Sequence, residues 1–203
     1  MKTKIFVLLF SFCAFSGSVI AQDRIASAFS RSIELEYKGE YTKAITPLKE
    51  VYDEKSYELN LRLGWLTYEA AQYVESAGYY HKAMVLMPYS IEAKLGYVYP
   101  ASALGNWDQV NTEYRDILQI DPQNTVVNYR MGLIEYNNKR YATAYKFFEK
   151  VVNLYPLGYD ALLMFAWTNY QLGKSREAKV LFGKVLLISP EDASAKEGLS
   201  LIK

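Results

Sequence analysis

The chain has 203 residues, enough for one domain or one continuous repeat array, and 51% of them are hydrophobic. Its formal net charge is +1 and it has no basic block, which argues against binding to nucleic acid or to an anionic membrane surface. One cysteine and one histidine exclude most zinc sites, cysteine–histidine nucleophile pairs and histidine-based triads. We therefore expect a protein that has no metal or other cofactor and is not an enzyme.

The first 21 residues have the pattern of a secretory signal peptide. Two lysines supply the positive start, residues 5–15 form an apolar run, and residues 19–21 resemble a cleavage site, which would make Gln22 the first mature residue. The apolar run is shorter than the roughly 20 residues that a membrane span needs. A retained membrane anchor is the alternative interpretation.

Cleavage after Ala21 would remove both lysines and the only cysteine, Cys13, and would change the formal charge from +1 to −1. An exported chain without cysteine has no disulfides and depends on apolar burial for its stability. We expect a periplasmic or extracellular protein that is not inserted in a membrane after cleavage.

From residue 56 onward the sequence repeats with a period of 34 residues. Prolines recur at this interval, and two positions after each proline comes a residue that favours helix N-termini. Counting 34 residues back from the first of these residues also reaches a serine. The prolines are Pro88, Pro122, Pro156 and Pro190, and the expected N-cap residues are Ser56, Ser90, Asn124, Gly158 and Asp192. Each proline and its cap residue therefore mark a loop that ends one helix and begins the next.

Apolar residues keep the same phase between these loops, as in the column formed by Leu63, Tyr97, Met131 and Phe165. A break in the middle of each unit separates two predicted helices of roughly 12 to 14 residues. The predicted units are residues 57–90, 91–124, 125–158 and 159–192, an earlier and shorter one at about 23–56, and a capping helix at 193–203. The short last helix is either a simple cap or an edge that docks on another subunit.

This pattern resembles the tetratricopeptide repeat family. The resemblance is carried by "LGWLTYEAAQYVESAGYYHKAMVLMP", "MGLIEYNNKRYATAYKFFEKVVNLYP" and "FAWTNYQLGKSREAKVLFGKVLLISP". Within them, Gly64, Gly132 and Ala166 match the small position of the first helix, and Ser76, Ala144 and Ala178 match that of the second. The resemblance implies an all-α fold, a right-handed α-solenoid of about five helical hairpins plus a short C-terminal capping helix. The first helices would line its concave face.

The concave face is predicted to carry a ladder of aromatic side chains. The ninth position of the four full units holds Trp65, Tyr99, Leu133 and Trp167, and the twelfth holds Tyr68, Ser102, Tyr136 and Tyr170. The twelfth position is often tyrosine in this family for packing reasons, whereas the ninth is not one that the fold requires to be large. We therefore expect both ninth-position tryptophans to be partly exposed and available to a partner.

Two arginines at equivalent positions, Arg62 and Arg130, are 68 residues apart. They would pair with acidic groups of a ligand or, alternatively, with Glu58 and Glu69 along the groove itself. The full predicted binding groove consists of Arg62, Trp65, Tyr68, Tyr99, Tyr129, Arg130, Leu133, Tyr136, Trp167 and Tyr170.

Pro100 lies in the middle of a predicted first helix, where a proline removes a backbone hydrogen bond and costs about 3 kcal/mol. We predict a kinked or broken helix that bends the groove. A hinge or a ligand notch is the functional alternative.

The predicted function is that of a non-enzymatic scaffold or adaptor of the cell envelope, which binds another protein or a peptide through its aromatic groove. A glycan- or cell-wall-binding module is the alternative, since stacked aromatic residues also receive sugar rings. An enzyme with an unfamiliar site is a third hypothesis. The sequence contains no glycine-rich phosphate loop, and its single Ser-x-x-Lys spacing, from Ser200 to Lys203, lies at the C-terminus.

Overall fold

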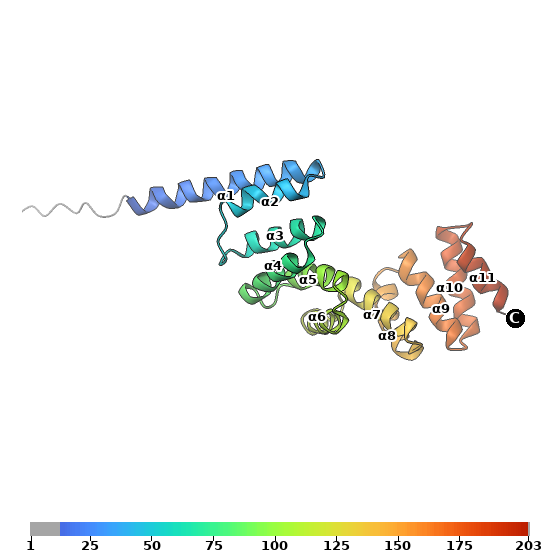
Figure 1. Cartoon of the computed structure of the whole chain (residues 1–203). Helices are drawn as coiled ribbons and strands as arrows, with labels where there is room; N and C mark the ends of the chain where they lie inside the picture. Colours follow the sequence, from blue (N-terminus) through green and yellow to red (C-terminus); the bar gives the residue numbers. More distant parts are fainter. Residues whose placement is uncertain (1–12, 203) are drawn as a thin grey trace, which may run out of the picture. The chain divides into compact units, whose positions relative to one another are not determined.

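The computed structural model describes the backbone of residues 13–202 and the side chains of residues 22–202. The first twelve residues of the expected signal peptide lie outside the described residues. Within the described part the chain forms eleven α-helices and no strand (Figure 1). The helices are α1 (Cys13–Tyr37), α2 (Tyr41–Lys49), α3 (Tyr57–Glu69), α4 (Tyr73–Leu86), α5 (Ile91–Ala103), α6 (Trp107–Ile120), α7 (Thr125–Asn137), α8 (Tyr141–Leu154), α9 (Tyr159–Gln171), α10 (Ser175–Ile188) and α11 (Ala193–Leu201).

The predicted cap residues begin the helices as the 34-residue period requires. Four of the five accept a hydrogen bond from the backbone N–H three residues later, and Gly158 is the N-cap without a side chain. The four bonds join Leu59 to Ser56, Ala93 to Ser90, Val127 to Asn124 and Ala195 to Asp192. Each satisfies an N–H group that has no partner inside the helix, so the prediction of five N-caps is confirmed.

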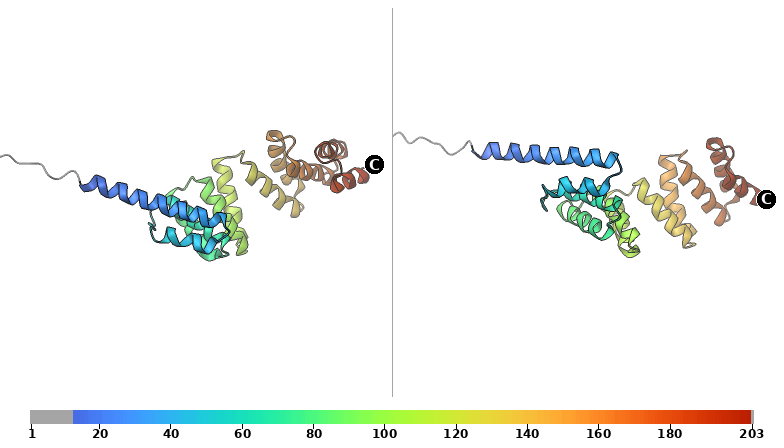
Figure 2. Two further views of the ribbon diagram at one scale, coloured as in Figure 1. Left: turned by 90° about the horizontal axis from the view of Figure 1, so that it is seen from above. Right: turned by 45° about the horizontal axis from the view of Figure 1, so that its top comes forward.

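The chain divides into two compact units, and the boundary lies within α6: unit 1 ends at Glu113 and unit 2 begins at Tyr114. In unit 1 each helix from α1 to α5 packs on the next one in the chain, and α3 also packs on α5. The N-terminal part of α1 runs beyond its shorter partner α2 (Figures 1 and 2). One core cluster of unit 1 consists of Ala28, Ala44, Ile45, Leu48, Leu59, Leu63 and Leu66.

Unit 2 repeats this arrangement with α7 to α10 and closes with α11, which packs on α9 and α10. Its buried core includes Ala144, Phe148, Leu162, Ala166, Phe182 and Val185. On the last helix, Ala195 is fully buried, and Leu199 and Ile202 pack against this core. The helix therefore covers the final hairpin, as the sequence predicted for a cap.

Aromatic rings of the second helices press against glycines of the first helices. Tyr80 on α4 lies between Gly64 on α3 and Gly96 on α5. A Cβ atom at Gly64 would come within 2.9 Å of the Tyr80 ring, and one at Gly96 within 2.1 Å. Phe148 contacts Gly132 in the same manner, at 2.6 Å from the Cβ that a side chain there would add. The small residues predicted at Gly64 and Gly132 are thus required because a ring occupies the space of their side chains.

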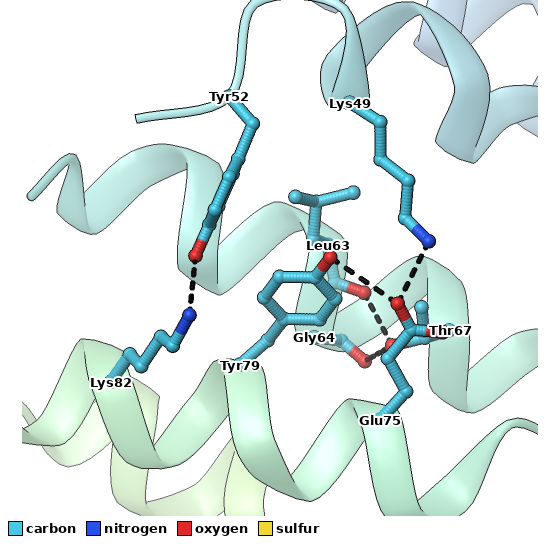
Figure 3. Close-up of polar contacts among 8 residues, drawn as sticks. All are labelled: Lys49, Tyr52, Leu63, Gly64, Thr67, Glu75, Tyr79 and Lys82. Carbon is cyan, nitrogen blue, oxygen red and sulfur yellow. Dashed lines mark hydrogen bonds and ion pairs between the residues drawn. The ribbon is translucent and has the colours of Figure 1, made fainter. Parts of the chain in front are cut away.

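The outer face of unit 1 holds polar contacts between its first two hairpins (Figure 3). Lys49 on α2 donates to Glu75 on α4 at 2.8 Å, and Lys82 on α4 donates to the Tyr52 hydroxyl at 2.9 Å. Tyr79 also donates to Glu75, and burial together with this carboxylate raises the pKa of Tyr79 to about 12. The Lys49–Glu75 pair is partly exposed, so we expect it to contribute less than about 1 kcal/mol.

Helix α5 continues through Pro100 from Ile91 to Ala103, so the helix is not broken there, and of the two predicted outcomes only a kink stays a prediction. Pro100 lies in the last turn, and its missing N–H removes one backbone bond, to the carbonyl of Gly96. The proline ring is buried at the position that Leu66 occupies in the preceding unit. The lost hydrogen bond is therefore offset in part by the packing of the ring.

Among the described residues, no helix combines the length and apolar character that a bilayer span requires.

Candidate binding groove

A groove with a cavity volume of about 860 Å³ lies in unit 1, between α1, α3 and α5 and above one ring from α4. We call it the unit-1 groove. It is lined by Phe29, Tyr57, Glu58, Leu61, Arg62, Trp65, Tyr80, Ile91, Glu92, Leu95, Gly96 and Tyr99. The lining comes mostly from first helices, on the side where the sequence predicted a binding surface.

Glu36 on α1 organises one wall of this groove. Its carboxylate accepts the Trp65 indole N–H at 2.6 Å and a guanidinium N–H of Arg62 at 2.5 Å. Burial raises the pKa of Glu36, but the hydrogen bonds from Trp65 and Arg62 and the charge of Arg62 outweigh it, so that the pKa is lowered from its ordinary value of 4.5. Charge-assisted bonds of this kind hold both side chains of α3 in fixed positions.

The partner of Arg62 within the chain is not one that the sequence predicted. The arginine binds Glu36 from the preceding hairpin rather than Glu58 or Glu69 from its own helix, so the prediction of those two partners was wrong for Arg62. Pairing with acidic groups of a ligand stays a prediction. The shorter first unit concealed this contact. The helix ends Tyr37 and Glu69 are 32 residues apart, so Glu36 takes the twelfth position, which Tyr68 occupies in the next unit.

Two aromatic side chains that line the groove, Trp65 and Tyr99, are joined by the ring of Tyr68, which is not itself part of the lining. The ring of Tyr68 is 6.1 Å from that of Trp65 and 5.4 Å from that of Tyr99, measured between centroids. Trp65 is half-buried, as the prediction of a partly exposed tryptophan requires, and Tyr99 is 49% exposed. Four predicted residues, Arg62, Trp65, Tyr68 and Tyr99, are thus brought together in unit 1.

Carboxylates and a tyrosine hydroxyl form another part of the lining. The Tyr57 hydroxyl is 2.7 Å from the Ser90 hydroxyl and 3.4 Å from the Glu92 carboxylate, so it links the start of α3 to the start of α5. Glu58 accepts a hydrogen bond from Ser56 at 3.0 Å, and Glu58 and Glu92 are both exposed. Both carboxylates are thus available to a ligand.

The other six predicted residues belong to unit 2. Five of them are half-buried and pack against its core: Tyr129, Leu133, Tyr136, Trp167 and Tyr170. The sixth, Arg130, is exposed. The indole N–H of Trp167 donates to the Ser194 hydroxyl on α11 at 2.8 Å, and the Trp167 ring lies 5.0 Å from the ring of Phe182. Trp167 is partly exposed as predicted, but it also fastens the last helix.

The part of the chain that the structure describes contains no group of three or more His, Cys, Asp and Glu side chains arranged to hold a metal ion. His81 is exposed on α4. The Ser200 hydroxyl donates to the Glu197 carbonyl at 2.7 Å, and Lys203 lies outside the described residues. The chemistry that the described groove offers is therefore binding through aromatic rings, apolar side chains and carboxylates.

Comparison with known proteins identifies repeats of one kind in unit 2. Residues 127–157 and 160–192 match the family model described as "Tetratricopeptide repeat". The matched ranges lie within the units 125–158 and 159–192 that the 34-residue period predicted. No curated protein matches the sequence.

Solved structures that are similar over most of the chain include the following two. A tetratricopeptide repeat protein from Parabacteroides merdae ATCC 43184 has a TM-score of 0.74 and 19% identity, covering 89% of this chain and 72% of its own. The MamA protein has a TM-score of 0.68 and 18% identity, covering 81% of this chain and 91% of its own. Identities this low establish likeness of fold alone. The predicted all-α fold of tetratricopeptide-like helical hairpins is confirmed.

Proposed function

We propose that the chain is a non-enzymatic scaffold or adaptor that binds a segment of another protein in the unit-1 groove. The observation that carries this proposal is the groove itself, with about 860 Å³ of space walled by Trp65, Leu95 and Tyr99. Ligand sites are typically concave, mostly apolar and several hundred cubic ångströms in volume. Aromatic side chains of this kind supply much of the binding energy at protein interfaces.

The fold supports the same proposal. Hairpin repeats stack so that successive first helices build an extended surface, and repeat proteins use such surfaces for recognition. The two tetratricopeptide repeat matches in unit 2 point to the same class of scaffold. A glycan ligand is the alternative, because sugar rings also stack on exposed aromatic faces.

We further propose that the protein acts in the cell envelope or outside the cell. The support is the signal-like segment that ends at Ala21. All the residues that line the groove come after this segment, so cleavage there would leave the groove in the mature chain. An exported scaffold would present the groove to partners of the same compartment.

A photo-crosslinking amino acid at position 99 tests the proposal, because Tyr99 is 49% exposed and lines the groove. The matched control carries the same group at Tyr89, which is 82% exposed and not part of the groove lining. In cells, position 99 is expected to trap a protein that position 89 does not. Mass spectrometry of the crosslinked product also reads the N-terminus of the chain that carries the photo-crosslinker, and this N-terminus is expected to be Gln22.

The trapped protein, once purified, should lose most of its affinity for Tyr99→Ala and keep its affinity for Tyr89→Ala. Identical products from positions 99 and 89 would contradict the groove as the binding site. Quenching of tryptophan fluorescence by cell-wall oligosaccharides, with no protein trapped, would favour the glycan alternative. An N-terminus before Gln22 in the mature chain would contradict cleavage at the predicted site.

A further inference from the structure

The unit-1 groove contains more carboxylates than cationic groups. Among the residues that line it, Arg62 is the only cation, and its guanidinium is bound to Glu36. Glu58 and Glu92 line the groove and are exposed. The lining therefore has two carboxylates and one guanidinium, and the guanidinium is already paired with Glu36.

Cations on the helices around the groove have other contacts. Lys94 on α5 donates to Glu113 at 2.9 Å, and Lys82 on α4 lies over the ring of Tyr52 on the outer face. Arg24 and Arg31 on α1 line a separate small cavity between α1 and α2. Among the side chains that the structure describes, the hydrogen bonds to Glu58 and Glu92 come from hydroxyl groups, of Ser56 and Tyr57, and none comes from a basic group. The negative charge at the groove is thus available to an incoming ligand.

We propose that the unit-1 groove binds a positively charged peptide segment, in which a lysine or arginine lies between Glu58 and Glu92 and an adjacent apolar residue packs on Leu95. This inference rests on the proposed function and specifies its ligand. Ammonium and guanidinium groups are attracted both to carboxylates and to the faces of tryptophan and tyrosine rings. Trp65 and Tyr99 supply such rings beside the two carboxylates.

Unit 2 provides an internal control, because three repeats separate equivalent positions by 102 residues. Asp160 corresponds to Glu58, but the residue that corresponds to Glu92 is the uncharged Ser194. A basic ligand is therefore expected to prefer the unit-1 groove. The control variant Asp160→Asn removes one exposed carboxylate at the matching position of unit 2 and leaves the unit-1 groove unchanged.

The test measures fluorescence anisotropy of three labelled peptides with the mature chain as isolated. The first peptide is Gly-Ser-Lys-Leu-Lys-Ser-Leu-Lys-Gly-Ser, and the other two carry glutamine or glutamate in place of every lysine. We expect the lysine peptide to bind about tenfold more tightly than the glutamine peptide. We expect the double substitution Glu58→Gln and Glu92→Gln to abolish this advantage and Asp160→Asn to preserve it. The preference should also weaken as salt rises.

The outcomes separate the inference from the proposed function. Equal binding of all three peptides, or strongest binding of the glutamate peptide, would overturn the inference and leave a protein-binding groove. Loss of the preference in Asp160→Asn as well would overturn it too, because the effect would then be one of net charge. Failure of every peptide to bind would overturn the inference, and the crosslinking from position 99 would decide the proposed function separately.

Discussion

Trp65 and Trp167 occupy the same position of their repeats, 102 residues apart, and both are half-buried. Their indole N–H groups nevertheless bind partners of different kinds. Trp65 donates to the carboxylate of Glu36 on the preceding hairpin, and Trp167 donates to the hydroxyl of Ser194 on the following helix. The repeat register thus sets the position of the indole on its helix, and the neighbouring helix supplies the hydrogen-bond acceptor, which differs between the two sites.

The two rings also differ in what covers them. Trp167 makes T-shaped contacts with Phe182 and Tyr170, at centroid distances of 5.0 and 5.7 Å. Trp65 faces a groove, and its contact with Tyr68 leaves part of the ring exposed. The last repeat therefore uses its tryptophan to attach the capping helix, whereas the repeat in unit 1 presents it beside a space that a partner can fill.

The largest difference we expect between the units concerns the glycines that face Tyr80 and Phe182. Gly96 and Gly198 occupy equivalent positions, and an added Cβ would come within 2.1 Å of the Tyr80 ring and 2.3 Å of the Phe182 ring. Helix α5 has 13 residues and is held by α3, by α4 and by the Lys94–Glu113 ion pair, whereas α11 has 9 residues and is held by α9 and α10, so α11 can shift from its ring more easily. We expect Gly96→Ala to lower the free energy of unfolding by about 3 kcal/mol and Gly198→Ala by about 1 kcal/mol.

Urea unfolding followed by circular dichroism measures both effects. Gly78 and Gly183 are helical glycines with nothing within 4 Å of an added Cβ, so they serve as controls in unit 1 and unit 2. Alanine at either position should raise the free energy of unfolding by about 0.5–1 kcal/mol, because alanine favours the helix. Equal losses for Gly96→Ala and Gly198→Ala would show that the last helix is held as firmly as α5.

The next effect in size concerns the acceptors of the two indoles. Glu36→Gln keeps an oxygen for Trp65 but removes the charge that faces Arg62, and we expect it to lower the free energy of unfolding by about 2 kcal/mol. Ser194→Ala removes a neutral acceptor from Trp167, and we expect a loss of about 1 kcal/mol. The same urea experiment measures both values.

Glu34, an exposed glutamate on α1 close in sequence to Glu36, provides the control, and Glu34→Gln should change the free energy of unfolding by less than about 0.5 kcal/mol. A Ser194→Ala loss larger than that of Glu36→Gln would reverse the proposed difference between the two sites. The Trp167–Ser194 bond that attaches the capping helix would then contribute more to stability than the charge of Glu36 contributes in the groove wall.

Most of the fold follows from the sequence because the period is marked by local chemistry. The cap residues act within three residues of their partners, so Ser56 and Asp192 identify helix starts without reference to the rest of the chain. The small residues at Gly64 and Gly132 follow from the repeat pattern in the same way. Pro100 does not break α5, contrary to one of the two predicted outcomes, because it lies buried in the last turn, and where that turn lies depends on where the helix ends.

The candidate site was only partly predictable for a related reason. The register predicted Arg62, Trp65, Tyr68 and Tyr99, which the structure brings together, but it missed Glu36. That contact depends on the first unit being two residues shorter, which shifts α1 relative to the 34-residue period. The signal that could have found Glu36 is the end of the helix before Gly39, whose φ of +71° marks the turn.

Ionisation of Glu36 gives the finest distinction between the two tryptophans. Burial alone would raise the pKa of Glu36. The bonds to Trp65 and Arg62 lower it by more than burial raises it, so the pKa in the folded protein is below the value of 4.5 that Glu36 has when unfolded. The contribution of the carboxylate to stability is therefore fully present above pH 4.5 and is lost as the pH falls through the lower, folded pKa. We expect the indole ¹⁵N–¹H resonance of Trp65 to move in this acid range, because its acceptor changes from a carboxylate to a carboxylic acid.

The chain has three tryptophans, so Trp65→Phe and Trp167→Phe assign the indole signals directly. In Glu36→Gln, the Trp65 resonance should no longer move in the range where Glu36 titrates. Trp167 donates to the hydroxyl of Ser194, which does not ionise and lies two residues after the N-cap Asp192. A hydrogen bond from Tyr159 and backbone N–H bonds lower the pKa of Asp192 from 3.8, so a shift of Trp167 caused by this carboxylate should come below that pH. A Trp167 signal that moved with the midpoint of Trp65 would show that the two indoles sense one common unfolding event, and the distinction between a groove wall and a cap contact would then fail.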